Sequence, residues 1–418
     1  MSKVTTAKMS EEPTRMGQED SFGGYMQGWL RRVRAGDLGS LPIIFGLIVI
    51  AIIFGIREPI FFVPRNFVNL LLQMAGITTI AIGIVFVLLI AEIDLSVGFV
   101  SGVGGVAMVL LLREGEGNPN WPWWAAILAA LLLTLLIGLL HGLIITRFGV
   151  PSFVVTLAGL LAWSGVVLIM TTKFSTAGTI VIQNEIVLGI ANSFLPTQWG
   201  WALFAIAVGG YAFSTFSQRQ SMVRQNLVAR PLLVDLLSVG GLALVAGFAV
   251  WYANQDRGVP VVAVIVIVLL VSWSFVANRT RFGRYVYAVG GNPEAARRAG
   301  INVARIRIMV FMISSFMAGV GGIVLASRLR SVDTNTGGGN LLLNAIAAAV
   351  IGGTSLFGGS GKVSSALLGA LVIASVENGM GLLGLASGTK FVVNGLVLLA
   401  AVLVDAVSRR SRESSGIA

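Results

Sequence analysis

The chain contains no cysteine and a single histidine, His141. Without cysteine it can form neither a disulfide nor a thiolate metal site, and one histidine excludes a metal site built from several imidazoles. Charged residues make up only 11% of the 418 positions, whereas soluble proteins average about 25%. Water is therefore not the main solvent of this chain.

Apolar sequence takes the place of the missing charges, with 56% hydrophobic residues and a mean hydropathy of +0.89. At about 20 residues per crossing, this content predicts an all-α, polytopic transmembrane helical bundle of about 10–14 membrane segments. The segment 1–40 is polar and is expected to be a disordered cytoplasmic tail, 41–407 the membrane domain, and 408–418 a second cytoplasmic tail. The twelve apolar runs lie near 41–56, 67–91, 95–112, 122–146, 151–171, 199–215, 234–252, 259–277, 305–327, 340–357, 363–384 and 390–407.

The net charge of +11 comes from 29 Lys and Arg residues against 18 Asp and Glu residues. If the N-terminus is cytoplasmic and every run crosses, 21 of the 29 basic residues fall on the cytoplasmic side. Cytoplasmic loops of membrane proteins are rich in Lys and Arg, so the distribution predicts that both termini are cytoplasmic. It also makes a nucleic-acid partner unnecessary as an explanation for the charge.

The basic loop 278–304 contains a short helix signature. Asn292 suits an N-cap, Pro293 the first helical position, and Gly300 the residue after the helix end. Glu294 lies at the positive helix end and Arg297 at the negative end. A helix this short needs a packing partner, so it either docks on a soluble cytoplasmic protein or lies along the membrane surface. The residues assigned to this docking element are Gly291, Asn292, Pro293, Glu294, Ala295, Ala296, Arg297 and Gly300.

Two acids, Glu92 and Asp94, separate two long apolar runs. Acids at membrane depth are costly and often functional, so either could bind substrate or carry a coupling proton. Asp94 could instead cap a helix that begins at Leu95, and this is at least as plausible. Either role places a helix N-terminus beside the permeation path.

The glycine-rich stretch 352–361 does not match a phosphate-binding loop. That motif needs glycine, four residues, and then Gly-Lys-Ser/Thr, but Leu356 and Val363 stand at the first glycine and at the hydroxyl position. The stretch is better explained as a break between two membrane segments.

Polar residues inside the apolar runs either contact a passing solute or join helices to one another, and for any one of them helix packing is favoured. The candidates for the translocation path are Asn69, Gln73, Asp94, Ser96, Asn378 and Asn394.

Several of these motifs, in this order along the chain, resemble the permease subunits of bacterial ABC importers for monosaccharides of the ribose, xylose and arabinose type. The motifs are Glu92-Ile93-Asp94-Leu95-Ser96-Val97-Gly98, Pro151-Ser152-Phe153 with Thr156-Leu157, Gly283-Arg284-Tyr285, Ala288-Val289-Gly290-Gly291-Asn292, Ala295-Ala296 with Gly300-Ile301-Asn302, Ala345-Ile346-Ala347-Ala348, Val350-Ile351-Gly352-Gly353-Thr354-Ser355 and Asn378-Gly379. The resemblance covers roughly 67–180 and 258–407.

The resemblance implies a homodimer in the cell inner membrane, surrounded by lipid, with a cytoplasmic ATPase and an extracytoplasmic sugar-binding protein as partners. It implies no enzyme activity and no cofactor in the permease itself, and it identifies 283–301 as the region that meets the ATPase. The chain departs from shorter ribose-type members by the insertion 216–257, which is similar to the longer xylose-type members, and His141 stands where asparagine is usual. Xylose is therefore the expected sugar. The alternative is an ion-coupled secondary sugar transporter that uses Glu92 or Asp94.

Overall fold

The computed structural model describes residues 41–414, apart from 116, 226, 228 and 229, and also residues 23, 24, 26, 27 and 30. The predicted tail 1–40 lies almost wholly outside the described residues. Contacts divide the chain into two units. The larger unit comprises 39–195 and 255–407, and the smaller comprises 196–254 with both chain ends.

The smaller unit contains two long helices packed on each other, α8 (Thr197–Arg224) and α9 (Leu232–Ala253). Each follows a proline, whose fixed φ and missing N–H suit the start of a helix. Arg219 of α8 forms an ion pair with Asp235 of α9 at 3.2 Å. The insertion that the sequence analysis placed at 216–257 comprises the last residues of α8, the connecting segment and α9.

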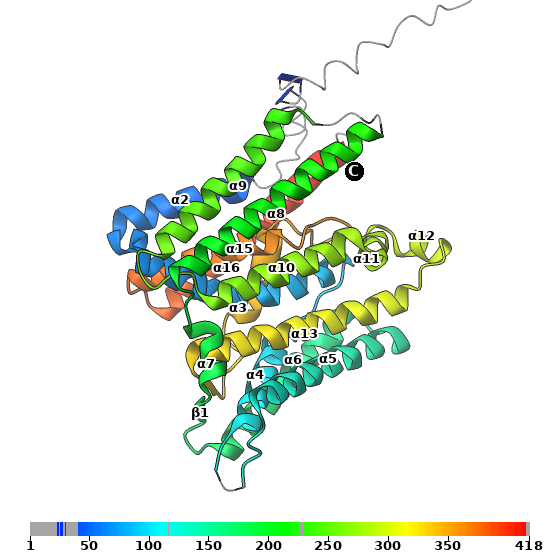
Figure 1. Cartoon of the computed structure of the whole chain (residues 1–418). Coiled ribbons are helices and arrows are strands. Elements are labelled where there is room, and N and C mark those ends of the chain that lie inside the picture. Colours follow the sequence, from blue (N-terminus) through cyan, green and yellow to red (C-terminus); the bar gives the residue numbers. More distant parts are fainter. Residues whose placement is uncertain are drawn as a thin grey trace, which may run out of the picture. The chain divides into compact units, whose positions relative to one another are not determined.

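The larger unit is organised around α13 (Val303–Leu329), which packs against α3 (Pro64–Leu89), α4 (Val97–Leu112) and α5 (Trp123–Phe148) (Figure 1). Gly76 lies against Leu325, whereas Gly83 lies against Ser314, so α3 and α13 are antiparallel. Small residues at these crossings allow the helices to approach closely, as is usual between membrane helices.

Helix α4 is the most enclosed of these helices, because nearly all of its 16 residues are buried. It is also too short to cross a bilayer core of about 30 Å unaided, since 16 residues rise by only about 24 Å. An extended segment, 91–96, leads into it from the end of α3.

Helix α14 (Leu341–Ile351) is shorter still, and a second non-helical segment, 334–340, precedes it. The two non-helical entries meet, because Gly98 in the first turn of α4 lies against Gly337 and Leu342. The predicted break at 352–361 follows α14, and glycines with positive φ turn the chain there. The sequence prediction of broken helices is therefore correct at 92–96 and 352–361, whereas the segment 334–340 was not predicted.

The two breaks share a backbone pattern. Ala91 after α3 and Arg330 after α13 both adopt left-handed conformations, with φ of 58° and 59°. An aspartate follows three residues later in each case, Asp94 or Asp333, and accepts a hydrogen bond from the backbone N–H two residues ahead, at 3.0 and 2.9 Å. Since α3 and α13 are antiparallel, these two similar turns run in opposite directions along the helix pair.

A two-stranded antiparallel sheet lies at one end of the larger unit. Its strands are β1 (Thr179–Val181) and β2 (Ser331–Asp333), with Ile180 opposite Val332. Helix α7 (Glu185–Asn192) lies at the same end of α13, while α11 (Arg281–Gly291) and α12 (Pro293–Arg298) lie at the other (Figure 1). The remaining elements are α2 (Leu41–Arg57), η1 (Pro59–Phe62), α6 (Ser152–Phe174), α10 (Val261–Arg279), α15 (Ser365–Leu382) and α16 (Ser387–Ser414).

Each of the twelve apolar runs coincides with one helix, which confirms the all-α bundle. Among the described residues, eight helices are long and apolar enough to span a membrane, and α2, α4, α14 and α16 are shorter apolar helices. Helix α16 continues to Ser414, so it extends into the stretch 408–418 that was assigned to a tail.

Candidate functional site

The carboxylate of Asp94 is buried at the entrance to α4 and joins two helices. Its Oδ1 accepts hydrogen bonds from the backbone N–H of Ser96 at 3.0 Å and from the Ser96 hydroxyl at 2.6 Å. Its Oδ2 accepts a hydrogen bond from the hydroxyl of Ser314 in α13 at 2.8 Å. Asp94 is therefore not an N-cap at Leu95, as the sequence suggested, because α4 begins at Val97 and Ser96 stands at the cap position without capping it.

His141 extends this cluster into α5 and α6. Its Nδ1 lies 3.4 Å from the Ser96 hydroxyl, and its Nε2 accepts a hydrogen bond from the indole N–H of Trp163 at 3.1 Å. A Cβ atom at Gly159 would lie 2.8 Å from Nε2, so glycine makes room for the ring. A continuous buried polar chain thus links α13, the 91–96 segment, α5 and α6, which agrees with the packing role expected of His141.

Glu92, two residues before Asp94, is more exposed to solvent than Asp94. Its Oε1 forms an ion pair with Nη2 of Arg307 in α13 at 2.9 Å; the Glu92 side chain is largely buried and that of Arg307 is partly exposed. The Nε atom of Arg307 is buried and has no hydrogen-bond partner within the described part of the chain. Both acids of the break are thus bound to α13, Glu92 by an ion pair and Asp94 by a hydrogen bond.

The end of α3, helix α11 and the glycine-rich stretch 352–361 meet at the end of the larger unit that carries α11. The backbone N–H of Gly359 donates to the carbonyl of Leu89 at 2.9 Å, and a Cβ atom at Gly290 would lie 1.7 Å from that carbonyl oxygen. The hydroxyl of Tyr287 donates to the carbonyl of Gly361 at 2.8 Å. Burial raises the pKa of the Tyr287 phenol above its ordinary value, so this donor keeps its proton at neutral pH.

Helix α12 forms with the caps that the sequence predicted. The side chain of Asn292 accepts a hydrogen bond from the N–H of Ala295 at 2.9 Å, Pro293 is the first helical residue, and Gly300 has a φ of +82°. Glu294 and Arg297 form an ion pair on the helix surface.

The three alanines of the α12 region, Ala295, Ala296 and Ala299, differ in their exposure, which the sequence did not indicate. Ala296 is buried in the core of its own chain, whereas Ala295 and Ala299 are exposed. A partner protein could therefore contact Ala295 and Ala299 but not Ala296.

The amides proposed for the translocation path are paired within the chain. Asn378 exchanges two hydrogen bonds with Asn66 and also donates to Gln73 at 3.3 Å. Asn69 accepts a hydrogen bond from Arg257 at 2.8 Å. The contacts of Asn378 join α15 to α3, and the contact of Asn69 joins α3 to the turn at Arg257, so each amide has a partner within the chain, as the packing alternative predicts.

A second amide group lies between α14, α15 and α16. Asn344 donates to Glu377 at 2.6 Å, and Asn394 donates to Glu377 at 3.3 Å and to Asn344 at 3.4 Å. The carbonyl oxygen of Asn394 is buried without a hydrogen-bond partner among the described residues. Of the predicted path residues, Asp94 and Ser96 belong to one cluster, and the amides belong to separate ones.

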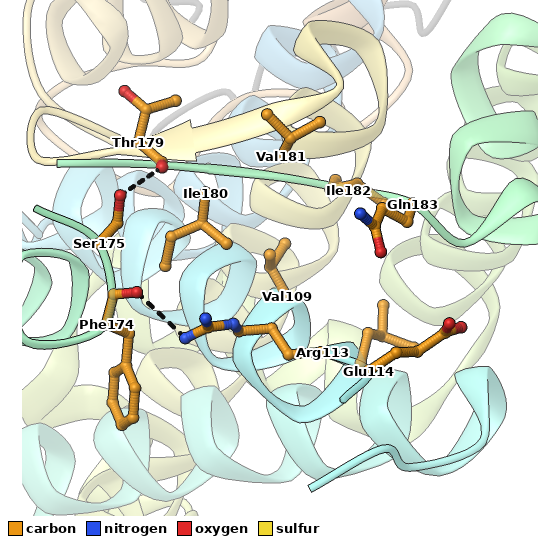
Figure 2. Close-up of a pocket in the computed structure, with 11 residues that line it drawn as sticks. Val109, Arg113, Glu114, Phe174, Ser175, Thr179, Ile180, Val181, Ile182 and Gln183 are labelled. Carbon is orange, nitrogen blue, oxygen red and sulfur yellow. Dashed lines mark hydrogen bonds between the residues drawn. The ribbon is translucent and has the colours of Figure 1, made fainter. Parts of the chain in front are cut away.

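A pocket of about 290 Å³ lies at the opposite end of the larger unit, between the ends of α4 and α6 and strand β1 (Figure 2). Arg113 donates from Nη1 to the carbonyl of Phe174 at 3.1 Å, and the Ser175 hydroxyl donates to the carbonyl of Thr179 at 2.7 Å. The amide of Gln183 points toward Arg113 (Figure 2). The pocket shares no residue with the Asp94 cluster.

Sequence reasoning missed the partners of these residues. Arg307 was counted only among the cytoplasmic basic residues, and Ser314, Trp163, Asn66 and Asn344 were not singled out. Ser314 had one signal, since it is a hydroxyl residue within a long apolar run. Asn344 had the same kind of signal, as an amide within the apolar run 340–357, whereas Asn66 and Trp163 gave no local signal.

The larger unit contains long antiparallel apolar helices and two short helices, α4 and α14, whose N-terminal ends meet. Its buried carboxylates are hydrogen-bonded or ion-paired to neighbouring helices. These features define a polytopic membrane transport protein. The chain belongs to the permease family described as "Branched-chain amino acid transport system / permease component", whose sequence model matches residues 66–402.

Curated relatives give the same class. The chain is 39% identical over 350 residues to the xylose transport system permease protein XylH of Escherichia coli (strain K12), covering 83% of this chain and 86% of the relative. It is 35% identical to XylH of Haemophilus influenzae, covering 89% and 98%. It is 32% identical to the ribose import permease protein RbsC of Bacillus subtilis, covering 88% and 94%. No solved structure matches the chain.

Proposed function

We propose that this chain is the membrane-spanning permease subunit of an ATP-driven importer of a monosaccharide. In this proposal a separate cytoplasmic ATPase supplies the energy, and an extracytoplasmic sugar-binding protein delivers the sugar. The observation that carries it is α12, a fully capped two-turn helix that presents Ala295 and Ala299 to solvent. Permeases of xylose and ribose systems as relatives support the same function.

The proposed orientation places α11 and α12 in the cytoplasm, together with both termini, and the sheet β1–β2 outside. Basic residues cluster at the α12 end of the larger unit, from Arg279 to Arg307 and at Arg147 and Lys362. Loops rich in basic residues remain cytoplasmic, which supports this orientation in the cell inner membrane.

Xylose is the proposed sugar. The XylH relatives are 35–39% identical to the chain, whereas the RbsC relatives are 31–33% identical. The additional helix α9 agrees with this choice, because the insertion 216–257 resembles the longer xylose-type permeases. The family description names branched-chain amino acids, so an amino acid belongs among the substrates tested.

The permease is proposed to act as a homodimer surrounded by lipid. Apolar side chains of α5, α6 and α10 are exposed in the single chain, including Leu136, Leu161 and Val271. Exposed apolar surface of this kind needs either lipid or a second copy of the chain to cover it.

The ion-coupled alternative assigns a travelling proton to Glu92 or Asp94. Both carboxylates are already engaged, Asp94 with hydroxyl and amide donors and Glu92 with Arg307. Neither carboxylate can therefore carry a proton across without first breaking its contacts with α13.

Sugar uptake by cells that express the permease with its ATPase and binding protein tests the proposal. Xylose uptake should continue for a short time after an uncoupler is added, should stop when ATP is depleted, and should exceed uptake of ribose, arabinose and leucine. Uptake that stops at once with the uncoupler while ATP persists would support the ion-coupled alternative instead.

A further inference from the structure

Helix α12 is rigidly continued into α13. The N–H of Ile301 donates to the carbonyl of Ala296 at 3.0 Å, and Asn302 caps α13 by accepting from the N–H of Arg305 at 2.9 Å. Ala296 and Val303 are buried in the same hydrophobic core. A displacement of α12 should therefore also displace the first turns of α13.

The first turns of α13 hold the 91–96 segment at two points. Arg307 holds Glu92 at 2.9 Å, and Ser314, two turns further along the helix, holds Asp94 at 2.8 Å. Seven residues of helix rise by about 10 Å, so the two contacts align the segment along α13 over that length. Two attachments fix both the position and the direction of the segment, which one alone could not do.

The same segment determines where α4 begins. Asp94 also accepts from the backbone N–H and the hydroxyl of Ser96, the residue directly before α4. The start of α4 in turn packs against the other non-helical entry, where Gly98 lies against Gly337. A shift of the 91–96 segment would therefore separate or close the contact between the two half-helix entries.

We propose that the Glu92–Arg307 ion pair is a coupling tie, which makes the entrance of α4 follow α13 when the ATPase moves α12. The inference rests on the proposed ATP-driven function and adds to it the positioning residues that transmit the motion. Of the two attachments, Glu92–Arg307 lies nearer to α12 along α13, so it transmits the movement first. Glu92 and Arg307 touch neither sugar nor nucleotide in this mechanism; they act through α4.

The test measures ATP hydrolysed per xylose imported by the complete transporter in proteoliposomes. Glu92→Gln and Arg307→Gln should each raise this ratio about fivefold or more, the lower range of coupling between sites, while assembly with the ATPase is kept. The charge-swapped pair Glu92→Arg with Arg307→Glu should restore the ratio toward that of the wild type. Arg305→Gln, an exposed cation two residues away, is the matched control and should leave the ratio unchanged.

The possible results separate the tie from the function on which it rests. If the wild type imports xylose with ATP but Glu92→Gln keeps the wild-type ratio, the tie is overturned and the function stands. A wild type without ATP-driven import overturns both. If Glu92→Gln fails to assemble, Arg307→Gln and Arg307→Lys decide together, because only the second keeps a cation opposite Glu92. A raised ratio in Arg307→Gln that Arg307→Lys partly or wholly restores supports the tie, and equal ratios in the two variants overturn it.

Discussion

The side-chain amides of Asn66 and Asn378 exchange two hydrogen bonds, at 2.8 and 2.9 Å, although 312 residues separate them in sequence. The pair is buried and ties the start of α3 to the end of α15. Asn66 also donates to the carbonyl of Phe61 at 3.0 Å. Two amides that satisfy each other in this way leave few polar groups free for a passing sugar.

Replacing one member of this pair should be worse than replacing both. Asn66→Leu or Asn378→Leu leaves the buried carbonyl oxygen of the remaining amide without its donor and should cost about 1–3 kcal/mol of stability, whereas the double variant removes both amides and should recover most of the loss. Thermal unfolding in detergent measures the stabilities, and xylose uptake measures function. A double variant that is stable but does not transport would return Asn378 to the translocation path.

Gly290 and Gly291 offer a matched test of the contact between α11, the end of α3 and the glycine-rich stretch 352–361. A Cβ atom at Gly290 would lie 1.7 Å from the carbonyl oxygen of Leu89, but one at Gly291 would meet no described atom within 4 Å. Gly290→Ala should therefore displace α11 from α3 and cost about 3 kcal/mol. Gly291→Ala should be stable and active, and equal effects of the two changes would mean that this junction is not closely packed.

Docking of the ATPase on α12 should depend on the exposed alanines. Ala295→Asp should abolish capture of the ATPase in detergent extracts and leave expression and thermal stability unchanged, because the new charge faces solvent in the isolated permease. Ala386→Asp, an exposed alanine in the turn before α16, is the control and should keep the ATPase bound.

Ala296→Asp should affect the permease differently from Ala295→Asp. Ala296 is buried in its own chain, so a charge there should destabilise the permease itself by several kcal/mol and lose the ATPase only as a consequence. Capture of the ATPase by Ala295→Asp at the wild-type level would show that α12 is a membrane-surface helix rather than a docking element.

Asp94 distinguishes a structural carboxylate from a proton carrier. Asp94→Asn keeps a carbonyl oxygen that can accept from Ser96 but cannot carry a proton, so transport should persist with a loss of stability of about 1–2 kcal/mol. Asp94→Ala leaves the donors of Ser96 and Ser314 unpaired and should cost about 3 kcal/mol or more. Loss of xylose uptake by Asp94→Asn, with normal expression and assembly, would support proton coupling.

The sequence predicted well whatever depends on neighbouring residues. The twelve apolar runs, the caps of α12 and the glycine break at 352–361 are local patterns, and each appears in the structure. The role of Asp94 could not be predicted in this way, because one of its partners, Ser314, is 220 residues away. A cap at Leu95 was the best local explanation, and a long-range contact replaced it.

Glu92 and Ala296 illustrate the same limit. Arg307, which pairs with Glu92, reads as one more cytoplasmic cation until α13 is placed beside the 91–96 segment. Ala295, Ala296 and Ala299 are chemically identical, so only the packing of α12 on its own chain reveals that Ala296 is covered. Which alanines a partner can reach is a property of the tertiary fold.

Sidedness is the last prediction, and single cysteines test it without interference because the native chain has none. Cysteines are placed at Ser217 and Asn292 and, for the opposite side, at Asn118 and Asn335. With cytoplasmic termini, a membrane-impermeant thiol reagent applied to intact cells should label Asn118→Cys and Asn335→Cys and leave the other two unlabelled. All four positions are at least partly exposed in the structure, so burial does not account for a lack of labelling.

Permeabilised cells provide the control, since all four cysteines should then react. The predicted orientation follows from the charge distribution. In the structure, Asn292 is the N-cap of α12 and Asn335 follows β2, and these two elements lie at opposite ends of α13 (Figure 1). Because α13 is one helix of 27 residues, about 40 Å long, its two ends must lie on opposite sides of a bilayer that it spans. Labelling of Asn292→Cys but not Asn335→Cys from outside would show that the permease has the opposite orientation in the membrane. The α12 surface would then face away from any cytoplasmic ATPase, and the ATP-driven mechanism would fail with it.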